Sequence, residues 1–502
     1  MSANLFHRIE HTLTQDLDRD CLITGDGARL TRGQLLADTD RMAKVLQDLG
    51  VNTGDRVSVQ IDKDFLNVVV YLAVLKMGAV YLPLNSAYAD AEIEYFLADA
   101  EPSLHICTSS RAEAAQEIGQ RLGIQVTTLD LDGGALRTLF DAQTQGFGAA
   151  VDRAGTDLAS FLYTSGTTGK PKGAMLTHQN LTANAEMLTQ AWDYSSEDTL
   201  LHALPLFHVH GLFVALNLAL LNGGQVILLP KYDADEIVRL MPQATVMMGV
   251  PTYYTRLLKQ PAFDRDISQH MRLFISGSAP LLVETSNEFF QRSGHRILER
   301  YGMSETGMSC SNPLHGERRA GSVGPALPGV TAKVVDDNGQ PCPRGEVGNL
   351  LVKGDHVFAG YWKLPEKTAS EFTDDGFFIT GDLATLSDDD YVSIVGRGKD
   401  LIITGGLNVY PKEIEDVLNE QPGVVESAVV GVAHEDFGEG IVAVLVGQGP
   451  LDFDALSDSV RDQLAAFKLP RRWHQVDELP RNTMGKVQKN LLREAYAKDY
   501  QP

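Results

Sequence analysis

Short apolar segments of strand length alternate with helical patterns along the first two thirds of the chain. Five such segments, rich in Val, Ile, Leu or aromatic residues, are residues 56–61, 104–107, 161–163, 225–229 and 246–250. Short buried runs that alternate with helices favour sheets covered by helices, so the pattern predicts α/β layers. Because 502 residues exceed the usual size of one domain, we expect more than one packed unit.

The pattern changes near residue 331, where short strands become separated by Gly, Pro and Asp turns. It changes again after the Gly-rich segment 396–400, where helix-like and strand-like stretches follow each other. We therefore predict an α/β fold with a large N-terminal domain over residues 1–396, which includes a β-barrel-like subdomain at about 331–396. A small mobile α+β domain is predicted over residues 397–502.

The chain is strongly acidic, with 43 Lys and Arg against 66 Asp and Glu and a formal charge of -23. Such a protein repels phosphate backbones, which argues against nucleic acid as a partner. A phosphate-bearing ligand must therefore be held by local devices, such as backbone N–H groups, a few basic side chains and a metal ion.

The spacing of the cysteines and the N-terminal sequence indicate the cellular compartment in which the protein is expected. The four cysteines, none of them in CxxC spacing, are Cys21, Cys107, Cys310 and Cys342. This spacing predicts reduced thiols rather than disulfides or a zinc site. The first residues carry no basic stretch followed by an apolar core, and no apolar run is long enough to span a bilayer. We expect a cytoplasmic protein that does not bind membranes.

Residues 163–173 read YTSGTTGKPKG, an apolar strand that runs into glycines, hydroxyl residues and lysines. Backbone N–H groups, hydroxyls and ammonium groups together suit a phosphate-binding loop. A flexible surface turn has the same composition, and composition alone leaves both interpretations open. The Walker A pattern is excluded because Pro171 follows Lys170, where that pattern requires Ser or Thr.

Further motifs follow in a fixed order: GSAP at 277–280, YGMSETG at 301–307, TGD at 380–382, GRGKD at 396–400 and NTMGK at 482–486. With YTSGTTGKPKG, they make nearly the whole chain resemble the adenylate-forming superfamily of acyl-CoA synthetases, luciferases and peptide-synthetase adenylation domains. The resemblance implies activation of a carboxylic acid by ATP to an acyl-AMP, followed by transfer of the acyl group to coenzyme A. ATP, Mg²⁺ and coenzyme A are the implied cofactors and co-substrates.

The resemblance also implies the roles of individual residues. The implied ATP-binding residues are Thr164, Ser165, Gly166, Thr167, Thr168, Gly169, Lys170, Lys172, Gly277, Ser278, Ala279, Tyr301, Gly302, Met303, Ser304, Thr306, Asp382 and Arg397. Glu305 offers the hard oxygen ligand that Mg²⁺ prefers. Lys486, His208 and Thr164 are the implied catalytic residues, and Lys486 would stabilise charge that develops in the transition state.

The C-terminal domain of the superfamily rotates between the two half-reactions. The resemblance places the pivot of this rotation at Lys399, and motion about a few backbone dihedrals is physically ordinary. Gly405 and Gly406 would line the tunnel for the thiol arm of coenzyme A, because glycines let a narrow chain pass close to the backbone.

The acid is predicted from the segment VPTYYTRLL, in which Pro251 starts a helix and Thr252 and Arg256 share one face. A buried guanidinium needs an anionic partner, most simply a second carboxylate. His208, Ser276 and Ser278 would complete a polar wall. Val209 and Met308 would shape the space around the substrate's C2. The stretches LPLFHVHGL at 204–212, VPTYYTRLL at 250–258 and GAVYLPLNSAY at 78–88 look most like malonyl-CoA synthetases, which use an Arg at the matching helix position.

Several alternatives stay open. Arg256 in a solvent-facing ion pair would remove the argument for a dicarboxylate. Methylmalonate or another small dicarboxylate would also suit the pocket. Phe207-His208 lacks the acidic residue that amino-acid activation needs, and a bulky luciferin conflicts with a buried Arg256.

A catalytically silent nucleotide-binding protein is the alternative from another class, and retention of Lys486, Glu305 and Asp382 speaks against it. The spacing of Pro480 and Gly485-Lys486 also resembles a target of lysine acetyltransferases, which would act on Lys486. We expect a monomer or homodimer.

Overall fold

The computed structural model describes residues 2–164, 171–404, 407–434, 437–461, 463–464, 466–482 and 485–500. The chain divides into two compact units. The first comprises Met1–Thr331 with Lys353–Phe378, and the second comprises Ala332–Val352 with Ile379–Pro502. The predicted boundary of the mobile domain at residues 396 and 397 stays a prediction.

The first unit contains two sheets. In spatial order, the first sheet consists of β14 (Gly307–Ser311), β13 (Leu298–Met303), β12 (Leu273–Ser276), β11 (Val246–Gly249), β9 (Thr199–His202), β10 (Gln225–Leu228), β1 (Asp20–Thr24) and β2 (Arg29–Thr31). The second consists of β17 (Gly360–Tyr361), β8 (Lys172–Thr177), β7 (Leu158–Thr164), β4 (Val80–Pro83), β3 (Arg56–Gln60), β5 (Leu104–Cys107) and β6 (Gln125–Thr128). All five apolar runs singled out in the sequence lie on these strands, and the α/β prediction is confirmed.

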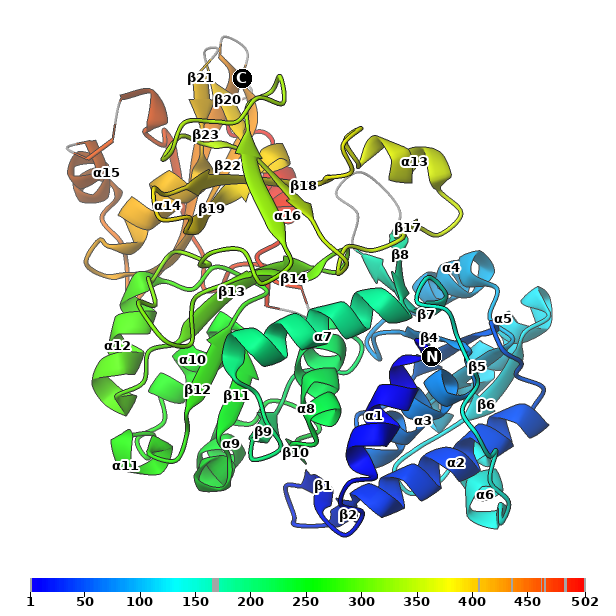
Figure 1. Ribbon diagram of the computed structural model, residues 1–502. Coiled ribbons are helices and arrows are strands. Elements are labelled where there is room, and N and C mark those ends of the chain that lie inside the picture. The colour runs from blue at the N-terminus through cyan, green and yellow to red at the C-terminus, as the bar shows by residue number, and fades with distance from the viewer. Residues whose placement is uncertain are drawn as a thin grey trace. The chain divides into compact units, whose positions relative to one another are not determined.

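Helices between the two sheets form the centre of this unit (Figure 1). They are α1 (Leu5–Leu13), α3 (Phe65–Lys76), α7 (His178–Trp192) and α8 (Asn217–Asn222). Helix α3 is buried from Leu66 to Lys76, which explains why its sequence FLNVVVYLAVLK is apolar on every face. Helix α7 contacts β8 of one sheet and β14 of the other, so it ties together strands that both carry predicted site residues.

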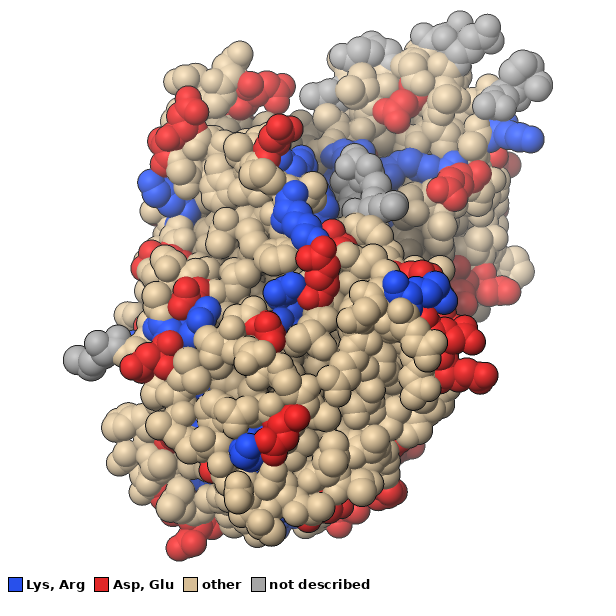
Figure 2. All heavy atoms as spheres, turned by 90° about the vertical axis from the view of Figure 1, so that its right-hand side faces the viewer, with Lys and Arg blue, Asp and Glu red and all other residues tan. Residues whose placement is uncertain are grey.

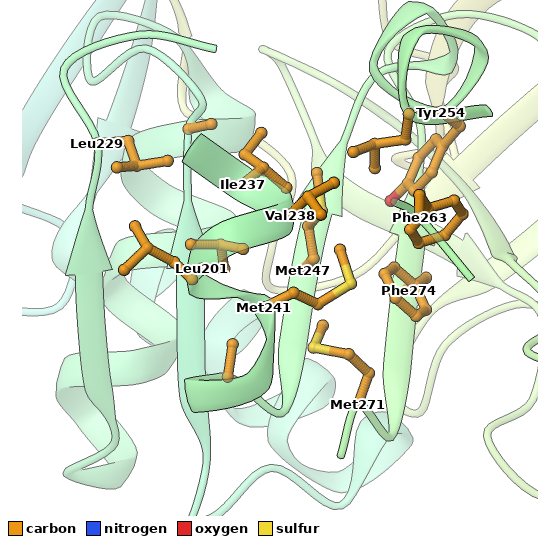
Figure 3. Close-up of a cluster of buried hydrophobic side chains, with 14 of the residues drawn as sticks. Leu201, Leu229, Ile237, Val238, Met241, Met247, Tyr254, Phe263, Met271 and Phe274 are labelled. Carbon is orange, nitrogen blue, oxygen red and sulfur yellow. The ribbon is translucent and has the colours of Figure 1, made fainter. Parts of the chain in front are cut away.

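The remaining elements of the first unit lie around these layers. They are α2 (Arg32–Asp48), α4 (Asp90–Ala100), η1 (Ser109–Arg111), α5 (Ala112–Leu122), α6 (Ala135–Ala142), the π-helix η2 (His210–Leu216), α9 (Ala234–Leu240), η3 (Met241–Gln243), α10 (Pro251–Leu258), α11 (Arg265–Ser268), α12 (Val283–Ser293) and α13 (Pro365–Ser370). Figure 3 shows side chains of α9, such as Ile237, against strand residues such as Leu201 and Met247. With Tyr254 of α10 and Phe274 of β12, they form an apolar core that fixes the first sheet.

The second unit also contains two sheets. One has the order β15 (Thr331–Val335), β16 (Gly348–Lys353), β18 (Phe378–Leu386) and β19 (Val392–Arg397). The other consists of β21 (Leu407–Val409), β20 (Ile402–Thr404), β23 (Gly438–Gly447) and β22 (Val424–His434), with β24 (Arg472–Gln475) paired to β23. The other elements are η4 (Gly398–Asp400), α14 (Pro411–Asn419), α15 (Phe453–Arg461), η5 (Ala466–Lys468) and α16 (Lys489–Ala495).

The β-rich region differs from its prediction in two respects. Among the described residues, its sheet runs from β15 to β19 without pairing between these edges, so the strands form an open sheet rather than a barrel. The segment Lys353–Phe378 belongs to the first unit, because β17 pairs with β8. Pairing between strands so far apart in the chain leaves no local signal in the sequence.

The surface agrees with the charge of the sequence. Figure 2 shows one face of the molecule, on which acidic and basic side chains are interspersed. No described helix combines the length and apolar character that crossing a bilayer requires.

Three buried histidines couple the stability of the first unit to pH. His105, His178 and His356 are at most 1% exposed. Burial lowers the pKa of each imidazole from 6.5 to about 4. Between pH 6.5 and pH 4, each of these histidines is protonated in the unfolded chain and neutral in the folded one. The free energy of unfolding therefore falls as the pH drops below 6.5.

We expect the free energy of unfolding to fall by at least about 4 kcal/mol between pH 7.5 and 5.5, at about 1.4 kcal/mol for each of these three histidines. Buried His202 and His210, whose pKa values burial also lowers, add to this loss. Urea titration at the two pH values measures this loss. His105→Gln removes one titrating group and should shrink the difference by about 1.4 kcal/mol. An unchanged midpoint in the wild type would contradict the assignment.

Candidate active site

The predicted site residues of the first unit follow neighbouring parallel strands. Strands β9, β11, β12 and β13 are adjacent and parallel. His208 comes after β9, Arg256 after β11, Ser276 ends β12 and Tyr301 lies near the end of β13. Because the carboxyl ends of parallel strands meet at one edge of a sheet, the fold gathers these residues where α/β proteins bind ligands.

The motif at residues 301–307 forms the hairpin between β13 and β14. A side chain at Gly302 would place its Cβ 1.9 Å from the carbonyl oxygen of Gly307, so only glycine fits there. Asn184 of α7 holds the hairpin from outside: its Nδ2 donates to the Met308 carbonyl at 2.8 Å, and its Oδ1 accepts from the Met308 N–H at 3.1 Å. The hairpin is therefore fixed by a tight backbone contact and a two-bond side-chain clamp.

The turn of this hairpin presents Glu305 and Thr306, which are 6% and 0% exposed. The Tyr361 hydroxyl donates to Glu305 Oε1 at 3.0 Å. A buried carboxylate beside a buried hydroxyl suits Mg²⁺, which binds through one or two carboxylates and takes its other ligands from water and substrate phosphates. No group of three or more His, Cys, Asp or Glu side chains that could hold a metal ion occurs among the described residues.

The predicted phosphate loop connects β7 to β8. Its residues Ser165, Gly166, Thr167, Thr168, Gly169 and Lys170 lie outside the described part of the chain. At its base, Thr164 pairs with Lys172 across the two antiparallel strands. Helix α4 anchors both sides of this base: Asp99 accepts from the Tyr163 hydroxyl at 2.6 Å, and the Tyr95 hydroxyl donates to the Pro171 carbonyl at 2.8 Å.

A cluster of buried polar atoms without hydrogen-bond partners lies around Arg300. Arg300 Nε and Nη2, Ser276 Oγ and His210 Nε2 have no partner among the described residues. The three residues are 4%, 1% and 0% exposed. Gly277 makes room for the guanidinium, because a Cβ there would lie 2.2 Å from Arg300 Cζ. Buried polar groups are normally satisfied, so this cluster points to a polar or anionic ligand.

The charge states of the side chains in this cluster suit an anionic ligand. Burial lowers the pKa of Arg300 to about 9, which shows how poorly this cation is solvated. Burial, and then the neighbouring Arg300, lower the pKa of His210 well below 6.5, so this imidazole is neutral at pH 7. His210 Nδ1 lies 3.3 Å from Ser278 Oγ. Arg300 is therefore a cation and His210 a neutral hydrogen-bonding group.

Arg256 differs from its prediction. Its side chain is exposed, and its guanidinium lies over the Tyr232 ring, 5.7 Å from the centroid. The expected desolvation of Arg256 is wrong for this structure, because the face that it shares with Thr252 is not covered. Arg256 therefore faces solvent, as the alternative expected. It does not pair with a neighbouring acid, since no carboxylate among the described residues forms an ion pair with it. Among the buried cations of this unit, which include Arg32 and Lys76, Arg300 has two guanidinium nitrogens without a partner.

The remaining predicted acid-side residues are packed tightly. Val209 and Met308 are 4% and 1% exposed, and His208 is half-buried with its Nδ1 accepting from the His210 N–H at 3.2 Å. Val209 and Asn184 line a cavity of about 10 Å³. That volume holds about one water molecule, so little spare room lies behind Val209.

In the second unit, Asp382 and Arg397 face each other across β18 and β19. Arg397 Nε lies 2.8 Å from Asp382 Oδ1, and Asp382 is 3% exposed. Lys399 is exposed in the short helix η4, and partial burial lowers its pKa. Its neighbour Asp400 pairs with Arg493 at 2.5 Å.

The C-terminal motif forms a turn that is closed by Asn482. Asn482 Oδ1 accepts from the Lys486 N–H at 3.0 Å, and the Asn482 N–H donates to the Lys486 carbonyl at 2.9 Å. Lys486 itself is exposed. Gly405 and Gly406, the predicted tunnel residues, lie outside the described part of the chain.

Sequence reasoning missed four residues of the site: Arg300, His210, Asn184 and Tyr361. Arg300 directly precedes the motif at 301–307, and its place beside that motif was the usable signal. His210 lies two residues after a predicted histidine. Asn184 and Tyr361 contact the motif from distant segments, which local patterns do not reveal.

Comparison with known proteins agrees with this geometry. Residues 9–362 match the model of the AMP-binding enzyme family, and residues 413–486 match the model of the AMP-binding enzyme C-terminal domain. The chain therefore belongs to the AMP-binding enzyme family.

Relatives within the family extend over nearly the whole chain. The malonate–CoA ligase of Arabidopsis thaliana is 34% identical and covers 94% of this chain and 86% of its own length. The crystal structure of ATP-bound MatB from Rhodopseudomonas palustris is 51% identical over 100% of both chains, with a TM-score of 0.97. The long-chain-fatty-acid–CoA ligase of Bacillus subtilis is 33% identical over 93% of this chain and 90% of its own length. Malonate–CoA ligases and MatB are thus among the relatives that match nearly the whole chain, and the site must account for how the acid is held.

Gly302→Ala tests the tight hairpin. Its methyl group would overlap the Gly307 carbonyl, so we expect a loss of about 1–3 kcal/mol in stability and at least about tenfold weaker ATP binding. Thermal unfolding and calorimetric titration with ATP measure the two effects. Gly133→Ala, where a Cβ meets nothing within 4 Å, is the control and should change neither. Equal behaviour of the two variants would refute the role of Gly302.

Proposed function

We propose that the protein is an ATP-dependent malonyl-CoA synthetase. It converts malonate and ATP to malonyl-AMP and pyrophosphate, and then malonyl-AMP and coenzyme A to malonyl-CoA and AMP. The observation that carries this proposal is the buried Arg300 guanidinium with two unpartnered nitrogens at the acid side of an AMP-binding enzyme. Relatives that are named malonate–CoA ligases support it.

The cluster around Arg300 favours a dicarboxylate over a monocarboxylate. Activation consumes one carboxylate of the substrate, so a second one is needed to remain as an anion. Arg300 can hold that carboxylate through charge-assisted hydrogen bonds, with Ser276 Oγ and His210 Nε2 as further polar contacts. The methyl end of a short fatty acid would leave all these groups unsatisfied. Arg256 is a second cation that can approach the acid from the solvent side.

The nucleotide would be held by the predicted ATP-binding residues. The loop that begins at Thr164, together with Lys172 and Thr306, would bind the phosphates. The segment 277–279 and Tyr301 would bind the adenine, and Asp382 with Arg397 the ribose. Glu305 would hold Mg²⁺, which neutralises phosphate charge when bound.

Adenylation requires little chemistry beyond placement and charge stabilisation. One malonate carboxylate oxygen attacks the α-phosphorus of ATP, and pyrophosphate leaves with the electron pair of the broken P–O bond. Lys486 supplies positive charge to the oxygens that become more negative in the transition state. Motion about Lys399 then withdraws Lys486. The coenzyme A thiolate, guided past Gly405 and Gly406, attacks the acyl carbon and releases AMP.

We also propose a cytoplasmic location and regulation by a lysine acetyltransferase that acts on Lys486. The exposed position of Lys486 makes it accessible, and acetylation removes the charge that adenylation needs. Methylmalonate is the second candidate acid. The tight packing of Val209 and Met308 favours the smaller malonate.

The choice of acid is tested by Arg300→Met and Arg256→Leu. Loss of a buried charge partner costs about 2–5 kcal/mol, so kcat/KM for malonate should fall by about 30- to 4000-fold in Arg300→Met. Arg256→Leu should cause a smaller loss because its charge is exposed. Activity of each variant with butyrate serves as its internal control and should be unchanged or higher. Parallel losses with both acids would show that Arg300 is only structural.

Lys486→Ala separates the two half-reactions. We expect the loss of pyrophosphate release from ATP and malonate to exceed by far the loss of thioester formation from preformed malonyl-AMP. Acetylated Lys486, identified by intact mass, should behave in the same way. Lys498→Ala, an exposed lysine near the same terminus, is the control. Equal losses in both half-reactions would rule out the assigned role, and an acetyltransferase that leaves Lys486 unmodified would rule out the regulation.

A further inference from the structure

Tyr361 lies between the two elements of the first unit that are assigned to phosphate and metal. Its hydroxyl donates to Glu305 Oε1 at 3.0 Å. On the other side, Lys172 Nζ lies 4.6 Å from the centroid of the Tyr361 ring, a distance at which a cation is attracted to an aromatic face. One side chain thus links the base of the phosphate loop to the metal-binding carboxylate.

The Tyr361 ring is held in one place. Strand β17 pairs with β8 through Tyr361 and Ala174, and the Tyr361 N–H donates to Thr368 Oγ1 at 2.8 Å. The edge-to-face contact with Phe358 has a centroid distance of 4.9 Å. Tyr361 is only 5% exposed. A ring with so many fixed neighbours has one rotamer, so its hydroxyl is a rigid donor.

Glu305 is held from the same short segment at two points. The Phe358 N–H donates to the Glu305 carbonyl at 2.7 Å, while Tyr361 binds its carboxylate. Carboxylates that ligate metals are commonly fixed by hydrogen bonds to their other lone pairs, and removal of such a partner costs about 10- to 100-fold in metal affinity or activity. Segment 358–361 therefore sets both the backbone and the side chain of the metal ligand.

We infer that Tyr361 is a positioning residue that orients the Glu305 carboxylate for Mg²⁺ and couples it to Lys172 at the base of the phosphate loop. The inference rests on the proposed function, in which Glu305 binds the Mg²⁺ of the nucleotide. Tyr361 does not touch the reacting atoms. Its effect is confined to the part of nucleotide binding that depends on the metal.

The test uses Tyr361→Phe, which keeps the ring and its contacts with Lys172 and Phe358 but removes the donor to Glu305. Calorimetric titration of the full-length protein with ATP is carried out once in the presence of Mg²⁺ and once in EDTA. The ratio of the two ATP affinities gives the increase in affinity that is due to the metal. We expect this increase to be about 10- to 100-fold smaller in Tyr361→Phe, while ATP affinity in EDTA stays within about twofold. An equal loss under both conditions, or no loss in Mg²⁺, would overturn the inference.

Two controls make the result specific. Tyr71→Phe removes another buried phenol, whose hydroxyl donates to Asn217 Oδ1 at 2.9 Å, and it should leave the Mg²⁺ dependence unchanged. In Glu305→Gln the effect of Mg²⁺ should be lost, and adding Tyr361→Phe should lower it no further, since Tyr361 acts through Glu305. A further loss in the double variant would overturn the inference. The double variant also lacks the unpaired buried charge, so it remains testable if the single variant does not fold.

Failure of this inference is distinct from failure of the proposed function. Malonate-dependent pyrophosphate release by the wild type tests the function without reference to Tyr361. If the wild type activates malonate and Glu305→Gln keeps its Mg²⁺ dependence, Glu305 is not the metal ligand and the inference falls while the function stands.

Discussion

A buried guanidinium without enough partners is the constraint on which the account of this protein depends. Arg300 lies within β13, in space that is left open by Gly277, the residue directly after the neighbouring strand β12. Burial of an unpaired charge is costly, and the lowered pKa of Arg300 reflects that cost. The fold tolerates it because the core around the first sheet is otherwise well packed. An anionic group of the substrate would remove the free-energy cost of this unpaired charge on binding. The site would therefore select substrates that carry such a group.

An acidic protein can bind the anionic ligands of the proposed reaction if individual basic side chains are placed at the binding sites. With a net charge of -23, the chain cannot attract ATP through its overall field. Instead, the proposed site relies on cations at specific points: Lys172 would face the phosphates, Arg300 the acid, and Lys486 of the second unit the charge of the transition state. The carboxylates are likewise placed, with Glu305 tied to Tyr361 and Asp382 to Arg397.

The sequence was sufficient for features that depend on neighbours along the chain. The buried strand 104–107 was predicted with its observed bounds, since buried parallel strands are continuous apolar runs. Helices α14 (Pro411–Asn419) and α15 (Phe453–Arg461) lie in the region after residue 400 where helix-like stretches were predicted. Features that depend on distant segments were not predictable. The pairing of β17 with β8 moves the segment 353–378 out of the expected β-rich subdomain, and the burial of Arg300 depends on a missing side chain at Gly277. Arg256 was correctly placed on a helix face but wrongly expected to be buried.

The central claim is that this site activates malonate through an acyl-AMP. The most direct measurement is exchange of labelled pyrophosphate into ATP in the absence of coenzyme A, with malonate, methylmalonate and butyrate compared at equal concentration. The account predicts rapid exchange that depends on malonate, slower exchange with methylmalonate and very little with butyrate. Exchange with butyrate at or above the rate with malonate, or no exchange with malonate, would contradict it.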